Sequence, residues 1–427
     1  MKKKILVISW FYPPINSSEG LVTFKLINNS KFEYDVFTQG TVEDWTYGSN
    51  VNYKNNDNVK VISSSANYIP FWVEEAVEYF RKNRDKYDAI MTRTMPQECH
   101  VAGIKIKKEF PEVKWIASFG DPIDKNPYHH IACSLFSYSS LKNFINKDAG
   151  LRFKLSPKRI LKNTIWEIRN KHARKLRNEL KYIQETTIKM ADSIILNNES
   201  QKKYMLGDNT ENLSKATVVH HSYDKSFYNA NTKKDNKKIR FLFVGHLDEI
   251  RNVTPILIAI NALKEADEKL SEKVEFVFFG NMSNADKLYI MDNQLFDVVK
   301  KEKSIDYERS LTEMCNADWL IHTDGNIGSV VDENIFFAAK IVDYFGSGTN
   351  IFATTMQNGN VVDVLKKSNA IVSSYSFNEI KNWLYLIIYQ GYSCSPNHEY
   401  IDAEFNSVNV AKVFDCAVDK LFNNDKG

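Results

Sequence analysis

The sequence predicts an α/β protein of two domains, each built on a doubly wound parallel sheet. Three observations support this prediction. The chain has 427 residues, more than a single core ordinarily holds. Short apolar runs alternate with helical patterns along most of it. A polar stretch at 229–240, NANTKKDNKKIR, separates two halves, and a second run of first-strand character, Phe241–Gly245, follows it directly.

The first half, residues 1–228, contains seven segments that we expect to be strands, because each is short, apolar and rich in β-forming residues. These are Ile5–Trp10, Tyr34–Thr38, Val59–Ser63, Ala89–Thr92, Trp115–Phe119, Ser193–Leu196 and Thr217–His220. Helical patterns such as Val73–Asn83 and Val101–Glu109 lie between several of them. Strands that alternate with helices favour a parallel sheet covered on both faces.

The second half, residues 241–400, repeats this alternation without repeating the sequence. The expected elements are strands Phe241–Gly245, Val274–Phe279, Trp319–His322 and Asn350–Ala353 and helices Pro255–Lys264, Ser310–Cys315, Phe337–Phe345 and Val361–Lys367. We interpret 229–240 as the linker between the halves. The amphipathic stretch Asn406–Phe422, within 401–427, predicts a final helix.

Composition narrows the class of protein. Hydrophobic residues make up 43% of the chain and charged residues 26%, as in soluble globular proteins. A formal net charge of +3 gives no support for nucleic-acid binding. No apolar run approaches the roughly 20 residues that span a bilayer. The basic and apolar start, MKKKILVISW, is short and lacks a cleavage site, so a buried strand explains it better than a signal peptide.

The five cysteines are scattered and form no C-x-x-C pair, which favours a reducing, cytoplasmic setting over a disulfide framework or a zinc site. His, Asp and Glu residues show no metal-ligand spacing either. We therefore expect a protein that needs neither a metal nor a cofactor.

The segment 142–181 differs in charge from the rest of the chain. It holds 13 Lys or Arg and 3 Asp or Glu, an excess of ten positive charges. One interpretation is a solvated basic helix packed on its domain. The other is an electrostatic docking site for anionic membrane lipid or for an acidic, lipid-linked acceptor.

Three segments carry residues suited to chemistry. The first is the loop Phe11–Gly20, FYPPINSSEG, which precedes a helical pattern at Leu21–Ile27. The free N–H groups of a helix N-terminus can hold a phosphate or an acceptor hydroxyl, and Gly20 would let a ligand approach the backbone. The loop has no G-x-G-x-x-G fingerprint of a nicotinamide site. It can equally be a plain strand-to-helix turn.

The second segment, FLFVGHLDEIRN, opens the second half at Phe241–Asn252. Gly245 ends a buried strand, and Arg251 could offer two N–H groups to a pyrophosphate. His246 is a further candidate ligand of the same site. The alternative for Arg251 is a surface position at a helix start.

The third segment, DENIFFAAKIVDYFGSGTNIFA, covers Asp332–Ala353. Lys340 and Asp343 are three residues apart on one expected helix, so both can reach the same edge of a pocket. A cation for phosphate beside a carboxylate for ribose hydroxyls suits a nucleotide diphosphate sugar. The alternative is an ion pair within the helix.

In this order, the three segments resemble those of retaining GT-B glycosyltransferases of family 4, over nearly the whole chain. FYPPINSSEG is similar to the family's Y-P-P loop with its glycine, FVGHLDEIRN to its donor-phosphate loop, and AAKIVDYFGSG to the segment of its second motif glutamate. Further similar segments are DAIMTRTMP, WIASFGDPIDKNP and VVHHSYDKSF.

The resemblance implies two Rossmann-like domains that face each other across a cleft. The first (1–228) would bind the acceptor, the second (241–400) would bind the donor, and the C-terminal helix would cross back onto the first. Asp343 stands at the position of the second motif glutamate, five residues before Gly348. The first motif glutamate would fall at Ile335, with Glu333 nearby. Asp121 lies in the region that carries a catalytic histidine in some members.

The resemblance thus implies a hexosyltransferase that moves a sugar from a nucleotide diphosphate sugar to a glycan or glycolipid hydroxyl, with retention, in bacterial surface polysaccharide synthesis. The expected catalytic residues are Asp121, Arg251 and Lys340, and the expected donor-binding residues are Gly20, Gly245, His246, Arg251, Glu333, Lys340 and Asp343. A cytoplasmic location, with peripheral contact to the plasma membrane, fits this role. The alternatives are a non-catalytic partner subunit, a glycan-binding pseudoenzyme and a sugar-nucleotide epimerase.

Overall fold

The computed structural model describes residues 2–40, 54–126, 170–228 and 236–423. Most of the basic segment expected at 142–181 lies outside these ranges, as do residues 229–235 of the expected linker. The last part of the basic segment belongs to α7 (Asn170–Met190).

The first domain contains a seven-stranded sheet in the order β3-β2-β1-β4-β5-β6-β7, and every neighbouring pair is parallel. Its strands are β1 (Lys4–Ile8), β2 (Glu33–Thr38), β3 (Val59–Ser63), β4 (Ala89–Arg93), β5 (Lys114–Ser118), β6 (Ser193–Leu196) and β7 (Ala216–Val218). Its helices are α1 (Ser18–Asn28), α2 (Ile69–Asn83), α3 (Glu98–Glu109), α7, α8 (Glu199–Leu206) and α9 (Thr210–Ser214).

The second domain contains a six-stranded parallel sheet in the order β10-β9-β8-β11-β12-β13. Its strands are β8 (Ile239–Val244), β9 (Val274–Phe279), β10 (Val299–Glu302), β11 (Trp319–Thr323), β12 (Asn350–Thr354) and β13 (Ile371–Ser373). Its helices are α10 (Thr254–Ala266), α11 (Leu270–Lys273), α12 (Asn284–Asp292), α13 (Tyr307–Cys315), α14 (Ala339–Ser347), α15 (Asn360–Lys367) and α16 (Phe377–Gln390).

Burial explains why the central strands were easy to predict. Each contains a continuous run of buried residues, mostly apolar, because helices cover both faces of a parallel sheet. In β1 the residues Ile5–Ile8 are completely buried, and they divide between two apolar cores on opposite faces of the sheet. The edge strand β10, by contrast, reads VKKE and exposes three of its four residues, so it carries no apolar signal. The sequence-based interpretation missed it, together with β13 and α16.

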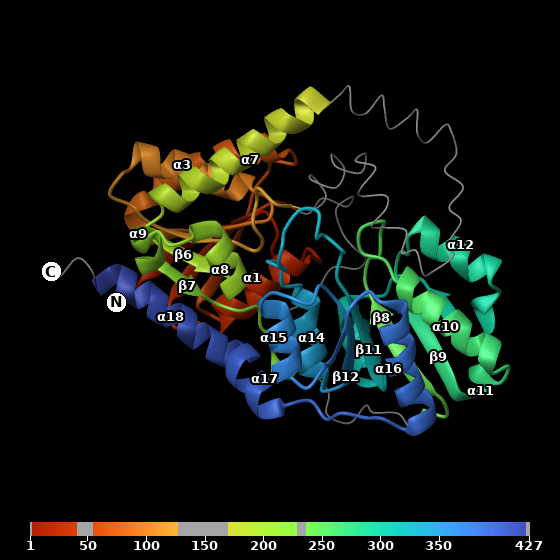
Figure 1. Ribbon diagram of the computed structural model, residues 1–427. Coiled ribbons are helices and arrows are strands. Elements are labelled where there is room, and N and C mark those ends of the chain that lie inside the picture. The colour runs from red at the N-terminus through yellow and green to blue at the C-terminus, as the bar shows by residue number, and fades with distance from the viewer. Residues whose placement is uncertain (1, 41–53, 127–169, 229–235, 424–427) are drawn as a thin grey trace.

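The chain crosses between the domains twice. Shortly before the linker, Tyr223 forms a parallel bridge with Asn406, and the Ser407 amide donates to the Tyr223 carbonyl at 2.9 Å. Helices α17 (His398–Phe405) and α18 (Ser407–Asn423) then lead back to the first domain (Figure 1). The apolar face of α18 joins the core beneath β1, β2 and β4. The prediction that the C-terminal helix crosses back is confirmed.

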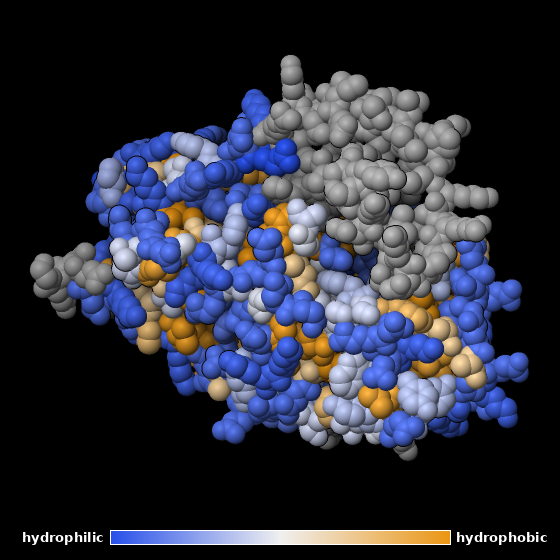
Figure 2. Space-filling model, viewed as in Figure 1, coloured by the Kyte–Doolittle hydropathy of each residue, from blue (hydrophilic) through white to orange (hydrophobic). Residues whose placement is uncertain are grey.

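On the coloured part of the face seen in Figure 2, the surface is mostly polar, with apolar side chains in separate patches. Among the larger exposed apolar side chains are Tyr68, Phe71 and Tyr182, which are 58%, 69% and 61% exposed. Within the described ranges, none of the helices is both long and apolar enough to cross a membrane.

Candidate active site

The predicted site residues lie where the carboxyl ends of strands from both sheets approach each other. In open parallel sheets, ligands bind outside these ends. Arg251 follows β8, Asp121 follows β5, and Lys340 begins α14 after β11. Arg251 is close enough to the other two side chains to lower the pKa of both Asp121 and Lys340. The fold therefore brings together residues that lie up to 219 positions apart.

Arg251 is held by a tight turn after β8. The Asp248 carboxylate accepts from the amides of Ile250 and Arg251 at 2.8 and 2.9 Å, and the Asp248 amide donates to the Arg251 carbonyl at 2.8 Å. The turn packs on Gly325, where a Cβ would lie 2.7 Å from the Ile250 side chain. The Arg251 Nε–H is buried and donates to no group that the structure describes. An unpaired buried donor of this kind is suited to an anionic ligand.

Lys340 lies beside Gly245, as a shared phosphate site requires. A Cβ on Gly245 would lie 2.6 Å from the Lys340 Nζ, and Gly245 has φ +139°, so only glycine fits there. The ammonium stands 3.8 Å from the centre of the Phe243 ring. Burial, followed by the nearby Arg251, lowers the pKa of Lys340 well below its ordinary value. A bound diphosphate would reverse this effect, because an anion favours the charged amine.

Asp324 supplies the negative charge beside this cationic pair. It directly follows β11 and accepts from the Thr355 hydroxyl at 2.8 Å and the Asn334 amide at 3.0 Å. His322 Nε2 lies 3.1 Å from its other oxygen. Burial opposes ionisation of Asp324, but His322, Arg251 and Thr355 together lower its pKa to about 2. Asp324 is thus a buried, ionised partner for Arg251 and Lys340.

The first domain contributes Asp121 from the loop after β5. Burial and the neighbouring Glu19 raise the pKa of Asp121 to about 7, although Arg93 and Arg251 act in the opposite direction. Glu19 accepts from the Arg93 guanidinium at 2.9 and 3.1 Å, and Arg93 also reaches Ser118 at 3.0 Å. A carboxyl group that titrates near neutral pH can exchange a proton with a substrate.

A free helix N-terminus completes the arrangement. The N-terminus of α10 is occupied, because Asp286 accepts from the Thr254 hydroxyl at 2.6 Å and from the Val253 amide at 3.4 Å. The N-terminus of α14 has the N-cap Ala338 and no side-chain cap. Its amides and Lys340 occur in the same turn, so partial positive charge from the helix adds to the two cations.

Asp343, the expected ribose ligand, faces the interface between the domains. Its Oδ1 accepts from Lys25 Nζ in α1 at 2.9 Å and from the Tyr307 hydroxyl at 2.7 Å. The alternative from the sequence was an ion pair with Lys340 in the same helix, but the ion pair formed is with Lys25 of the other domain.

The remaining predicted residues have contacts of other kinds in the structure. Glu333 pairs with Lys203 of α8 at 3.4 Å, and His246 is exposed. Gly20 is buried against its own loop, where a Cβ would lie 3.1 Å from the Tyr12 amide nitrogen, so its small size serves packing. Ile335 is 1% exposed in an apolar cluster with Ile327 and Val331. Donor contacts by Gly20, His246 and Glu333 stay predictions.

Sequence reasoning missed Asp324, His322, Glu19 and Arg93. A usable signal existed for the first two, since a polar H-T-D-G run ends a buried strand, where parallel sheets place ligand-binding groups. Arg93 likewise is a charged residue at the end of a buried strand. Glu19 had no such signal, because its partner Arg93 lies 74 positions away.

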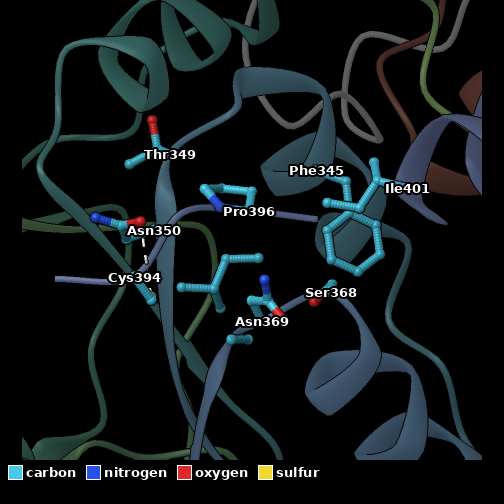
Figure 3. A pocket seen from close by; sticks show the side chains of 10 residues that line it. Phe345, Thr349, Asn350, Ser368, Asn369, Cys394, Pro396 and Ile401 are labelled. Carbon is cyan, nitrogen blue, oxygen red and sulfur yellow. Dashed lines mark hydrogen bonds between the residues drawn. The ribbon is translucent and has the colours of Figure 1, made fainter. Parts of the chain in front are cut away.

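A separate small cavity lies at the other end of the strands of the second sheet (Figure 3). It measures about 10 Å³ and is lined by residues that include Phe345, Asn350, Cys394 and Ile401. Asn350 begins β12, so this cavity is at the amino ends of the strands. A volume of this size holds about one water molecule, which excludes it as a nucleotide site.

Within the described parts of the chain, no group of three or more His, Cys, Asp or Glu side chains is arranged to hold a metal ion. The charges that could neutralise a diphosphate there are those of Arg251 and Lys340. Metal independence stays a prediction.

Comparison with known proteins identifies the fold. No protein-family model and no curated protein sequence matches the chain. Its structure is similar to a sucrose-phosphate synthase from Thermosynechococcus elongatus, with TM-score 0.65, 12% identity and coverage of 99% of this chain and 100% of the other. A glycosyltransferase from Rickettsia africae gives TM-score 0.62, 11% identity and 99% coverage of both chains.

A proposed UDP-N-acetylglucosamine 2-epimerase from Listeria monocytogenes is also similar, with TM-score 0.54, 10% identity and coverage of 99% of this chain and 97% of the other. At such identities the likeness concerns the fold alone. The two facing parallel-sheet domains with a C-terminal crossover form the GT-B fold, as the sequence predicts.

Proposed function

We propose that this protein is a glycosyltransferase that moves a sugar from a nucleotide diphosphate sugar to a hydroxyl of a glycan or glycolipid acceptor. One observation carries the proposal. Lys340, in the first turn of the uncapped helix α14, lies beside Gly245, and Arg251 is close enough to lower the pKa of Lys340. The buried Arg251 Nε–H has no partner in the described structure. This is a site for a compact anion with several acceptor oxygens.

The site suits the departure of a diphosphate. Two cations and a helix N-terminus stabilise the negative charge that develops on the leaving group, and these groups are in place before the reaction. Asp121 faces them from the other domain, with a pKa of about 7. Such a carboxyl group can receive the acceptor proton or orient the acceptor hydroxyl. We further propose that transfer proceeds with retention, in surface polysaccharide synthesis and without a metal.

The experiment starts with a thermal-shift screen against UDP, GDP, ADP and their sugars. One nucleoside diphosphate is expected to bind, and at 100 times its dissociation constant it stabilises the protein by about 2.7 kcal/mol. The matching nucleotide sugar is then expected to be consumed in buffer that contains EDTA, with release of the nucleoside diphosphate. Absence of binding by all of these compounds contradicts the proposal. Activity that EDTA abolishes and Mn²⁺ or Mg²⁺ restores contradicts metal independence.

Two other functions can be distinguished from a transferase by what happens to the nucleotide sugar. An epimerase converts the nucleotide sugar without releasing diphosphate, so product analysis without acceptor separates it from a transferase. A non-catalytic subunit binds the nucleotide but does not turn it over. The missing acid at Ile335, which lies in an apolar cluster, is the observation that favours this second alternative.

We also propose a peripheral contact with anionic membranes through the segment 142–181, in keeping with a lipid-linked acceptor. Its last residue, Lys181, is followed directly by Tyr182, and both side chains are exposed, a combination typical of membrane interfaces. Co-sedimentation with vesicles of anionic lipid is expected, and it should weaken with salt because exposed charges are screened within about 8 Å at physiological ionic strength. Neutralising Lys158, Arg159, Arg174 and Arg177 should reduce it, and unchanged co-sedimentation refutes the contact.

A further inference from the structure

Asp343 accepts all of its described side-chain hydrogen bonds on one carboxylate oxygen. Lys25 Nζ, the Tyr307 hydroxyl and the Tyr228 hydroxyl lie 2.9, 2.7 and 3.5 Å from Oδ1. From the residues that the structure describes, Oδ2 accepts none. The Asp343 side chain is 13% exposed, so it is not fully enclosed while Oδ1 is engaged.

The groups that hold Oδ1 come from three parts of the chain. Lys25 belongs to α1 of the first domain, Tyr307 begins α13 of the second, and Tyr228 directly precedes the linker. Tyr228 also donates to the Asp343 carbonyl at 3.1 Å. It approaches α14 closely because residue 346 is glycine, where a Cβ would lie 2.4 Å from the Tyr228 ring. The carboxylate is thus oriented from the other domain as well as from its own.

The ion pair is shielded from water, which distinguishes it from surface pairs. The Lys25 side chain is 3% exposed, and its Nζ also lies 3.2 Å from the Tyr307 hydroxyl. A buried ammonium cannot leave its carboxylate without a large desolvation cost, so the pair keeps one geometry. Oδ1 is therefore unavailable for a second role, and a ligand of Asp343 must use Oδ2.

We propose that Lys25 is a positioning residue for nucleotide binding, which holds Asp343 so that Oδ2 alone accepts from the ribose hydroxyls of the donor. This inference rests on the proposed function, because it assumes that a nucleotide binds beside Arg251 and Lys340. The Lys25–Asp343 pair would couple nucleotide binding to the contact between the two domains. Affinity for the nucleotide depends on a contact made only when α1 lies against α14, and by reciprocity the bound nucleotide strengthens that contact.

The test uses calorimetric titration of the full-length protein with whichever of UDP, GDP or ADP binds the parent, and with its 2′,3′-dideoxy form. Lys25→Met, which keeps the length of the side chain and removes the charge, is expected to weaken binding of the ribonucleotide about tenfold. The dideoxy form should bind parent and variant equally, because it lacks the hydroxyls that Oδ2 would accept from. Lys25→Arg should recover most of the lost affinity.

Two further variants keep the result decisive. Tyr307→Phe removes one hydroxyl at Oδ1 without removing a charge, and it is expected to weaken ribonucleotide binding about threefold even if Lys25→Met fails to fold. Lys31→Met is the matched control, because Lys31 also pairs with an aspartate far along the chain, Asp419, but at an exposed site. It should leave both affinities unchanged.

The outcomes separate the inference from the function on which it rests. One outcome is that the parent binds a nucleotide, and that the Lys25 and Tyr307 variants keep the parent's ratio of affinities for the ribonucleotide and its dideoxy form. Lys25 then has only a structural role, and the proposed function stands. Tighter binding by Lys25→Met would mean that Lys25 competes with the ribose, which also overturns the inference. If the parent binds no nucleotide, the proposed function falls and the inference falls with it.

Discussion

Replacing Arg251 by alanine is expected to lower the turnover number about a hundred- to a thousandfold, the effect of removing one group that stabilises charge in a transition state. Binding of the nucleoside diphosphate should weaken only about tenfold. Turnover is affected strongly because the charge on the leaving group is larger in the transition state than in the bound nucleotide sugar. The Nε–H of Arg251, buried and without a partner in the described structure, is the reason to expect a specific contact.

Steady-state kinetics with the donor found in the screen, together with titration of the diphosphate, measure the two effects separately. Arg251→Lys keeps the charge and loses the planar fork, so it should fall between parent and alanine variant. Arg309→Ala is the matched control, because Arg309 is 59% exposed on α13, pairs weakly with Glu313 at 3.9 Å and lies 6.0 Å from the centre of the Phe279 ring. Equal kinetics for Arg251→Ala and Arg309→Ala would remove Arg251 from the site.

Replacing Asp324 by asparagine is expected to lower the free energy of unfolding at pH 7 by about 2 kcal/mol. The pKa of Asp324 is lowered from 3.8 to about 2 in the folded protein, and each pKa unit corresponds to about 1.4 kcal/mol. A group whose pKa is lower in the folded state stabilises the protein above its unfolded pKa. That stabilisation disappears as the pH falls from about 4 to about 2.

Denaturant titrations of the parent and Asp324→Asn at pH 7 and at pH 2.5 check this prediction, and the difference in stability should be smaller at the lower pH. The control is Asp306→Asn, since Asp306 caps α13 by accepting from the Arg309 amide at 2.7 Å and asparagine caps a helix equally well. A difference for Asp324→Asn that does not change with pH would show that its charge does not stabilise the fold.

Much of the fold was predictable because it depends on local patterns. Strands Val59–Ser63 and Val274–Phe279 match the prediction residue for residue, and helix α15 begins one residue early. Buried parallel strands are continuous apolar runs, which a sequence displays directly. The edge strand β10 escaped because its side chains face solvent, and α16 escaped because no motif marked it.

The candidate site was predictable only in part. Arg251, Lys340 and Gly245 were identified because each follows a strand or begins a helix near a glycine, and the structure does bring them together. Asp324 and Glu19 were missed, although they set the charge around Arg251 and Asp121. Their roles depend on which strands are neighbours in space.

The sequence by itself determined two parallel-sheet domains and a final helix, and it marked Gly245, Arg251 and Lys340 as candidates for one site; the return of that helix to the first domain was implied by the family resemblance. These features follow from hydrophobic periodicity and from glycines and charges at strand ends, which act within a few residues. Only the tertiary structure decided the partner of Asp343. Spacing allowed an ion pair with Lys340, three residues away, but the buried Lys25 lies 318 positions earlier. Packing of α1 against α14 creates that pair, and no local pattern records which helices will meet.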